Sequence, residues 1–164
     1  MFLRGEHNIV TAVSELIRDQ CIRQDDENAP DISDFEQGMI FGKLAALEWV
    51  EGGEWNSLIK IVNREADDPF NIRRSHRDIL RIVNQLTEKV WWNRHQIWLE
   101  NISAGTEQIR CEEIFAAAKK AACRVERKYG KRNLGWDDIE WGMLNGQLSA
   151  LRWVIGDEWD NLDT

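Results

Sequence analysis

The chain has few residue combinations with the spacing that metal binding or catalysis needs. Its three histidines, His7, His76 and His95, lie in separate segments, and none has a His or Cys partner four residues away. Zinc sites need such clustered ligands. No GxSxG, HExxH, phosphate-binding glycine loop or dinucleotide fingerprint occurs. We therefore expect no metal, no cofactor and no catalytic residue of a familiar type, and lean towards a protein that is not an enzyme.

Acidic residues offer one enzymatic alternative. Glu36, Glu140, Glu54 and Glu158 recur at matching positions of a repeated segment, and carboxylate oxygens are the ligands that Mg²⁺ prefers. Helix capping explains Glu36 and Glu140, whereas Glu54 and Glu158 are expected in exposed turns. Mg-dependent nucleotide hydrolysis by an all-α enzyme is therefore kept as the second alternative function.

A basic stretch favours a different function. Residues 119–132 contain seven Lys or Arg and one Glu, although the whole chain carries a net charge of −8. Such asymmetry is typical of a surface that binds a nucleic-acid backbone or an acidic protein, but basic residues late in a helix also complement its dipole. The first alternative is therefore a nucleic-acid-associated regulator. Its candidate binding residues are Lys119, Lys120, Arg124 and Lys128.

A tryptophan-rich segment, VWWNRHQIWLE, carries our preferred contact site. Trp91 and Trp98 are seven residues apart, so they share one face of a helix and are expected in the core. Trp92 points about 100° away from Trp91. Trp and Arg are enriched among the anchors of protein interfaces, so we expect Trp92, Arg94 and His95 to form an exposed protein-binding site. The preferred function is thus a protein–protein interaction or adaptor module whose partner is another protein or a second copy.

A repeated phrase organises the elements around these residues. Aligning 34–58 with 138–162 gives 14 identities in 25 positions without a gap. Ser33 and Asp137 each precede a Glu by three residues, which is the signature of a capping box. From these caps, each predicted helix runs about 18 residues to a glycine that ends it.

Each copy of the phrase also contains two glycines inside the predicted helix, four residues apart. A glycine there costs about 1 kcal/mol relative to alanine, and small residues at this spacing allow a second helix to approach closely. We therefore expect the two copies to cross at these glycines, with tryptophans covering the helix ends. The structural residues are Gly38, Gly42, Gly142, Gly146, Trp49, Trp153, Trp55 and Trp159.

The complete pattern predicts an all-α fold: an internally duplicated helical-hairpin bundle of about five main helices, with a Gly-xxx-Gly crossing between the repeated helices. Apolar spacings of three and four predict further helices at about 8–25, 75–100 and 107–129. We expect a single domain, 1–164. It comprises repeat one at about 8–58, a connecting segment at about 59–101 and repeat two at about 107–162.

Composition limits the environment of the protein. A chain of 164 residues with 43% hydrophobic residues is long enough to bury a core. Three cysteines without a CxxC pair argue against a disulfide framework. No apolar run approaches the roughly 20 residues that span a bilayer, and no signal peptide is recognisable. We expect a cytoplasmic protein with no membrane partner, and the negative net charge disfavours general attraction to nucleic acid.

Overall fold

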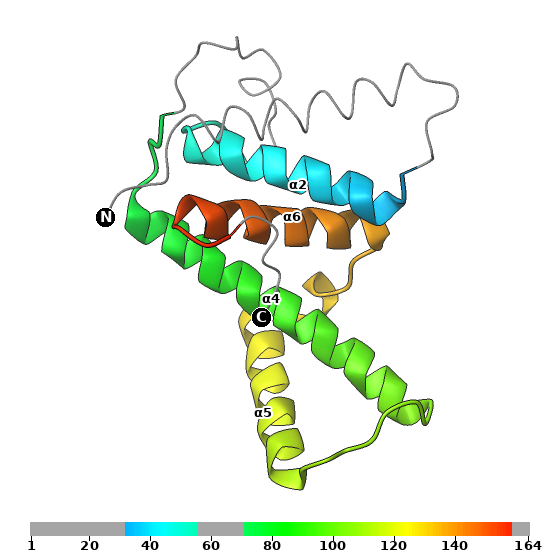
Figure 1. Ribbon diagram of the computed structural model, residues 1–164. Helices are drawn as coiled ribbons and strands as arrows, with labels where there is room; N and C mark the ends of the chain where they lie inside the picture. Colours follow the sequence, from blue (N-terminus) through cyan, green and yellow to red (C-terminus); the bar gives the residue numbers. More distant parts are fainter. Residues whose placement is uncertain (1–31, 56–70, 159–164) are drawn as a thin grey trace. The chain divides into compact units, whose positions relative to one another are not determined.

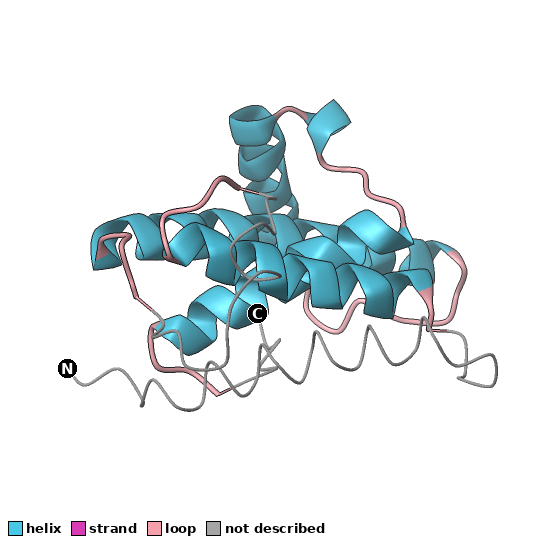
Figure 2. Ribbon diagram, turned by 90° about the horizontal axis from the view of Figure 1, so that it is seen from above, coloured by secondary structure: helices cyan, strands magenta, loops and turns pink. Residues whose placement is uncertain are grey.

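The computed structural model describes residues 32–55 and 71–158. Within these ranges the chain forms four α-helices, one short 3-10 helix and no strand (Figures 1 and 2). The predicted all-helical class is therefore confirmed for this part of the chain. The expected helix at about 8–25 and Trp159 lie outside the described residues. The elements are α2 (Asp34–Val50), α4 (His76–Ser103), α5 (Glu112–Tyr129), η1 (Lys131–Asn133) and α6 (Asp138–Val154).

Reciprocal capping boxes begin α2 and α6. The Ser33 hydroxyl accepts the backbone N–H of Glu36 at 3.2 Å, and the Glu36 carboxylate accepts the N–H of Ser33 at 2.9 Å. Asp137 and Glu140 make the same pair of bonds, at 2.8 and 3.2 Å. Each box satisfies two backbone donors that a helix start leaves free. These starts agree with the sequence-based prediction.

A glycine with positive φ follows each of the four described α-helices; Gly105, with φ +76°, lies two residues beyond the end of α4. Gly52 and Gly156 have φ values of +86° and +112°, just beyond α2 and α6, each 17 residues long. Gly130, with φ +79°, ends α5. These positive φ values suit glycine, which has no Cβ to clash with the backbone. The predicted ends of α2, α5 and α6 are therefore accurate to within about two residues.

The helix predicted at about 107–129 corresponds to α5, and its predicted start is wrong. The N–H groups of Thr106 and Glu107 instead bond to the carbonyl of Asn101, at 3.0 and 3.3 Å, and so close the end of α4. The α5 helix begins only at Glu112, after Cys111 in an extended conformation that makes no side-chain cap. Residues 104–111 therefore form the connection between the two helices, and the first turn of α5 lies about five residues later than predicted.

The described residues fall into two compact units, and the boundary lies inside α4. Unit one contains 32–55, 71–83 and 137–158, and unit two contains 84–136. In unit one, α2 and α6 run side by side in the same direction, although 104 positions separate them in the sequence (Figure 1). The buried apolar residues of these two helices include Leu44, Leu47, Val50, Leu144, Leu148 and Leu151.

Glycines lie where the α2 and α6 backbones touch. A Cβ placed on Gly42 would overlap the carbonyl oxygen of Met143 and lie 2.8 Å from the Cα of that residue. A Cβ on Gly146 would overlap the carbonyl oxygen of Met39. The same holds for the other glycine of each helix: Gly38 against the carbonyl of Ile139, and Gly142 against that of Phe35. Any side chain at these positions must therefore push one backbone away from the other.

An arginine ties the segment 71–75 to the end of α2. The Arg74 guanidinium donates to the carbonyl oxygens of Trp49 and Gly53, both at 2.9 Å, and lies 5.0 Å above the Trp49 ring. Trp55 packs edge-to-face on Trp49 with ring centroids 5.2 Å apart. A cation at this end of a helix satisfies free carbonyls and complements the dipole. This arginine is therefore structural.

Candidate binding groove between α4 and α5

Unit two is built around α5 and the part of α4 that follows Val83, two helices that run in opposite senses and spread apart towards the loop that joins them (Figure 1). Trp98 meets Phe115 near the connecting loop, with ring centroids 5.6 Å apart. At the other end, Lys128 donates to the Glu88 carboxylate at 2.6 Å. A core of Trp92, Ala122, Val125 and Leu134 lies between, with Trp91, Tyr129 and Trp136 packed against it.

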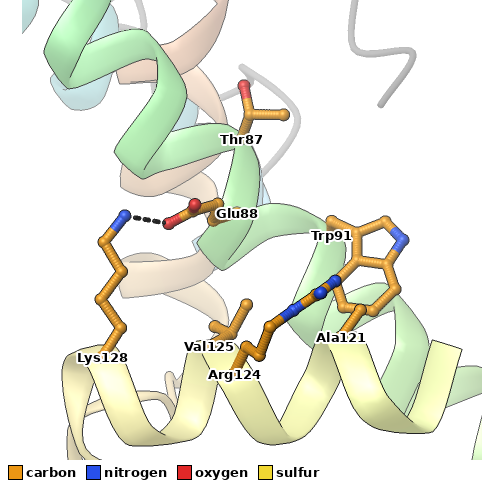
Figure 3. A pocket seen from close by; sticks show the side chains of 7 residues that line it. All are labelled: Thr87, Glu88, Trp91, Ala121, Arg124, Val125 and Lys128. Atoms are coloured by element: carbon orange, nitrogen blue, oxygen red, sulfur yellow. Dashed lines mark hydrogen bonds and ion pairs between the residues drawn. The ribbon is translucent and has the colours of Figure 1, made fainter. Parts of the chain in front are cut away.

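A pocket of about 450 Å³ opens between these two helices (Figure 3). Its volume falls within the range of roughly 300–1,000 Å³ that is usual for ligand pockets. We call it the α4–α5 groove. It is lined by Thr87, Glu88 and Trp91 of α4 and by Ala121, Arg124, Val125 and Lys128 of α5.

Helical spacing explains why these residues share the groove. On α4, Thr87, Glu88 and Trp91 follow one another at spacings of one and three, so they lie on one stripe of the helix. On α5, the lining residues recur at spacings of three and four, which also places them on one face. The groove therefore combines an apolar surface, made by Trp91, Ala121 and Val125, with two cationic side chains.

One of the two cations is already paired. The Glu88 carboxylate accepts from Lys128 and from the Tyr129 hydroxyl, which lies 2.5 Å away. Partial burial alone would raise the pKa of Glu88, but the hydrogen bonds from Lys128 and Tyr129 outweigh it and lower that pKa overall. The bond to Glu88 raises the pKa of Lys128. Both groups are therefore charged at neutral pH.

Arg124 is the second cation, and it is exposed. In the part of the chain that the structure describes, its side chain has neither a hydrogen bond nor an ion pair. Figure 3 shows the guanidinium reaching along the groove towards the Trp91 indole. The groove thus holds an arginine whose charge and five N–H donors face solvent.

We expected Trp92, Arg94 and His95 to be exposed, and that prediction is wrong. Trp92 is 6% exposed and His95 is 5% exposed, and Arg94 is half-buried. The Trp92 indole N–H donates to Glu126 of α5 at 3.3 Å, and its ring meets Trp136 edge-to-face. The side of α4 that we predicted to be free is therefore the side that α5 covers.

His95 is buried among aromatic rings of its own helix. Its ring stacks on Trp91 with centroids 5.2 Å apart and planes 6° from parallel, and it lies 5.6 Å from the Trp98 ring. Its Nε2 atom has no hydrogen-bond partner among the described residues. Burial lowers the pKa of His95 because the charged imidazolium would lose its hydration. His95 is therefore neutral at physiological pH.

The candidate nucleic-acid residues are all on the surface of α5, but they do not share one environment. Arg124 and Lys128 line the groove. Lys119 lies 5.3 Å above the Phe115 ring, whereas Lys120 is exposed one turn before Arg124. Lys120, Arg124 and Lys128 recur every four residues and form a basic row along α5, of which Arg124 and Lys128 line the groove.

Glu36, Glu140, Glu54 and Glu158 are the acidic residues that recur at matching positions of the repeated phrase. Among the described residues, no group of three or more His, Cys, Asp or Glu side chains is placed to hold a metal ion. Glu36 and Glu140 serve in the two capping boxes. Glu54 and Glu158 are exposed at the ends that follow α2 and α6. Their recurrence in sequence therefore reflects helix caps and turns.

Sequence reasoning named only Arg124 and Lys128 among the groove residues as candidates, and Trp91 is the largest side chain that it missed. We expected it in the core, but it is half-buried and lines the groove. The row Ala121, Arg124, Val125 and Lys128 was visible in the sequence as small, apolar and basic residues at helical spacing. The sequence did not show that α4 lies opposite that row, so the groove could not be predicted.

No family model, no curated protein and no solved structure matches this chain. None of the helices within 32–55 and 71–158 is both long enough and apolar enough to cross a bilayer.

Proposed function

We propose that this protein is a non-enzymatic interaction module that binds another protein through the α4–α5 groove. The observation that carries the proposal is the groove itself, where an accessible tryptophan and an unpaired arginine flank an apolar surface. Trp and Arg are the residues most enriched among interface hot spots. The proposed contact site therefore moves from Trp92, Arg94 and His95 on α4 to Trp91 on α4 and Arg124 on α5.

Other exposed apolar residues in unit two support an interaction surface there. Ile114 is 67% exposed and Ile97 is 45% exposed. Single exposed apolar residues are normal, but these two lie on the same helix pair that forms the groove. A partner that covers the groove and part of this pair would remove them from water.

The proposed role of the repeated phrase is to build the scaffold. We take α2 and α6 to be equivalent helices of two duplicated hairpins, related by a pseudo-twofold axis through a Gly-xxx-Gly crossing, in a bundle of about five main helices. Reciprocity supports this: Gly38 faces Ile139, and Gly142 faces Phe35, the position equivalent to Ile139. Gly42 and Gly146 likewise face the equivalent residues Met143 and Met39. Residues 84–136, which lie between the two copies of the phrase, are then free to carry the binding function.

Site-specific photo-crosslinking tests protein binding directly. A benzoylphenylalanine at Thr87, which lines the groove, is compared with one at Glu100, which is exposed elsewhere on α4. Irradiation in source cells should link a defined protein to position 87 and not to position 100. Equal labelling from both positions, or no discrete product from position 87, would refute binding at the groove.

Nucleic-acid binding is the second candidate, because the basic row Lys120, Arg124 and Lys128 is exposed. It predicts a salt-dependent gel shift that disappears when Lys119, Lys120, Arg124 and Lys128 are neutralised. Two features favour a protein instead: Glu88 already neutralises Lys128, and the groove surface is largely apolar. No observation on the described residues favours nucleotide hydrolysis.

A further inference from the structure

The two parts of the chain differ sharply in charge. Residues 84–136 contain ten Lys or Arg and six Asp or Glu, a net charge of +4, whereas the whole chain carries −8. The groove therefore lies in the positive segment of a negative protein. Oppositely charged patches steer association and select partners, so an acidic ligand is favoured at this site.

The charged side chains of the groove limit how many carboxylates of a ligand it can bind. Glu88 is already paired with Lys128, and its carboxylate would repel a second anion placed beside it. Arg124 remains available, and its planar fork suits a single carboxylate bound through two N–H groups. The groove is therefore built for one or two carboxylates and not for a continuous chain of phosphates.

The apolar surface specifies the rest of the ligand. Trp91, Ala121 and Val125 offer no charge, and the indole face presents a broad apolar area. A volume of about 450 Å³ accommodates side chains of a short segment and not a folded domain. The ligand must carry an aliphatic or aromatic side chain close to its carboxylate.

We infer that the α4–α5 groove binds a short acidic, amphipathic segment of another protein. Its apolar side chain packs on Trp91 and Val125, while a neighbouring Asp or Glu pairs with Arg124. This inference rests on the proposed protein-binding function and adds the chemistry of the partner. Lys120, an exposed cation four residues before Arg124, suits a second acidic residue one helical turn away on the ligand.

Selection from a random peptide library tests the inference with the full chain. Dodecapeptides displayed on phage are selected on the wild-type protein, and the enriched peptides are then synthesised with a fluorescent label. Binding is measured by anisotropy to the wild type, Arg124→Glu, Trp91→Ala and Arg127→Glu. Arg127 is the matched control, since it is an exposed cation on the same helix that does not line the groove.

We expect enriched peptides to carry an Asp or Glu within four residues of a Leu, Phe or Trp. Arg124→Glu should weaken them roughly tenfold or more, because a bond to a charged group is replaced by repulsion. Trp91→Ala should weaken them by a similar factor. Arg127→Glu should change the affinity by less than about threefold, since exposed charges at a distance are screened.

Three results would overturn the inference. The first is that no peptide is enriched, or that the enriched peptides lack acidic residues. The second is that Arg124→Glu and Arg127→Glu weaken binding equally. The third is that a labelled 20-nucleotide single strand binds in an Arg124-dependent manner while the peptides do not, which would assign the groove to nucleic acid. Failure of the crosslink at Thr87 defeats the proposed function, whereas a crosslinked partner whose contacting segment is not acidic defeats only this inference.

Discussion

The close approach of α2 and α6 makes Gly42→Ala a sensitive perturbation. The added methyl group would overlap the carbonyl oxygen of Met143 and lie 2.8 Å from both the carbonyl carbon and the Cα of that residue. All three atoms belong to the backbone of α6. A flexible side chain could rotate away, but a helical backbone moves only if the two helices separate.

The expected loss of stability follows from two opposing effects. Overpacking a core costs about 1–3 kcal/mol, and an obstructing backbone places this site at the upper end. Alanine is better than glycine in a helix by about 1 kcal/mol, which offsets part of the loss. The free energy of unfolding should therefore fall by about 2 kcal/mol. For a chain of this length, that corresponds to a decrease in Tm of roughly 4–8 °C.

Circular dichroism during thermal and urea unfolding measures this change. Gly146→Ala, at the equivalent position of α6, should show a loss of similar size because its methyl group meets the carbonyl of Met39. Gly135→Ala is the control, since no atom lies within 4 Å of its added methyl group, and it should stay within about 0.5 kcal/mol of the wild type. A Gly42→Ala protein that melts at or above the wild-type temperature would refute the backbone contact.

Three further predictions concern the core, a helix cap and a buried histidine. Trp92→Phe should lower the free energy of unfolding by about 1–2 kcal/mol, since it removes the hydrogen bond to Glu126 and part of a buried ring; an unchanged urea midpoint would contradict the burial of the indole. Asp137→Ala should cost about 1 kcal/mol in the same assay and Asp137→Ser should restore most of it, because only the capping oxygen is needed; equal losses in both would contradict the cap. The pKa of His95 is lowered in the folded state, so the unfolded chain binds its proton first, near pH 6.5, and stability should fall as pH drops below that value. His95→Phe should flatten this dependence in urea titrations between pH 7 and 5, and an unaltered slope would assign it to other groups.

Local signals explain the parts of the fold that the sequence predicted well. Ser33 with Glu36, and Asp137 with Glu140, bond within three residues of each other, so their chemistry does not depend on distant packing. The positive φ of Gly52 similarly follows from its place after the last turn of α2. Such features are readable because both partners stand next to each other in the chain.

Tertiary packing explains what the sequence misplaced. Trp91 and Trp92 project about 100° apart on α4, and both are large and apolar, so periodicity alone could not say which of them faces α5. Glu126 and Trp136, which contact the Trp92 ring, come from positions more than 30 residues later. The sequence therefore showed a basic stretch and a tryptophan cluster, but it did not show that the two lie opposite each other and line one groove.

Amide hydrogen exchange of the full chain, with and without a crosslink-identified partner, tests the central claim most directly. Binding at the α4–α5 groove predicts slower exchange in the peptides that contain 87–91 and 121–128, because those amides lose solvent access and local opening. Peptides from α2 and α6 should exchange at the same rate in both samples, as expected for a scaffold. Protection confined to 34–50 and 138–154, with none in 87–91 or 121–128, would contradict the account.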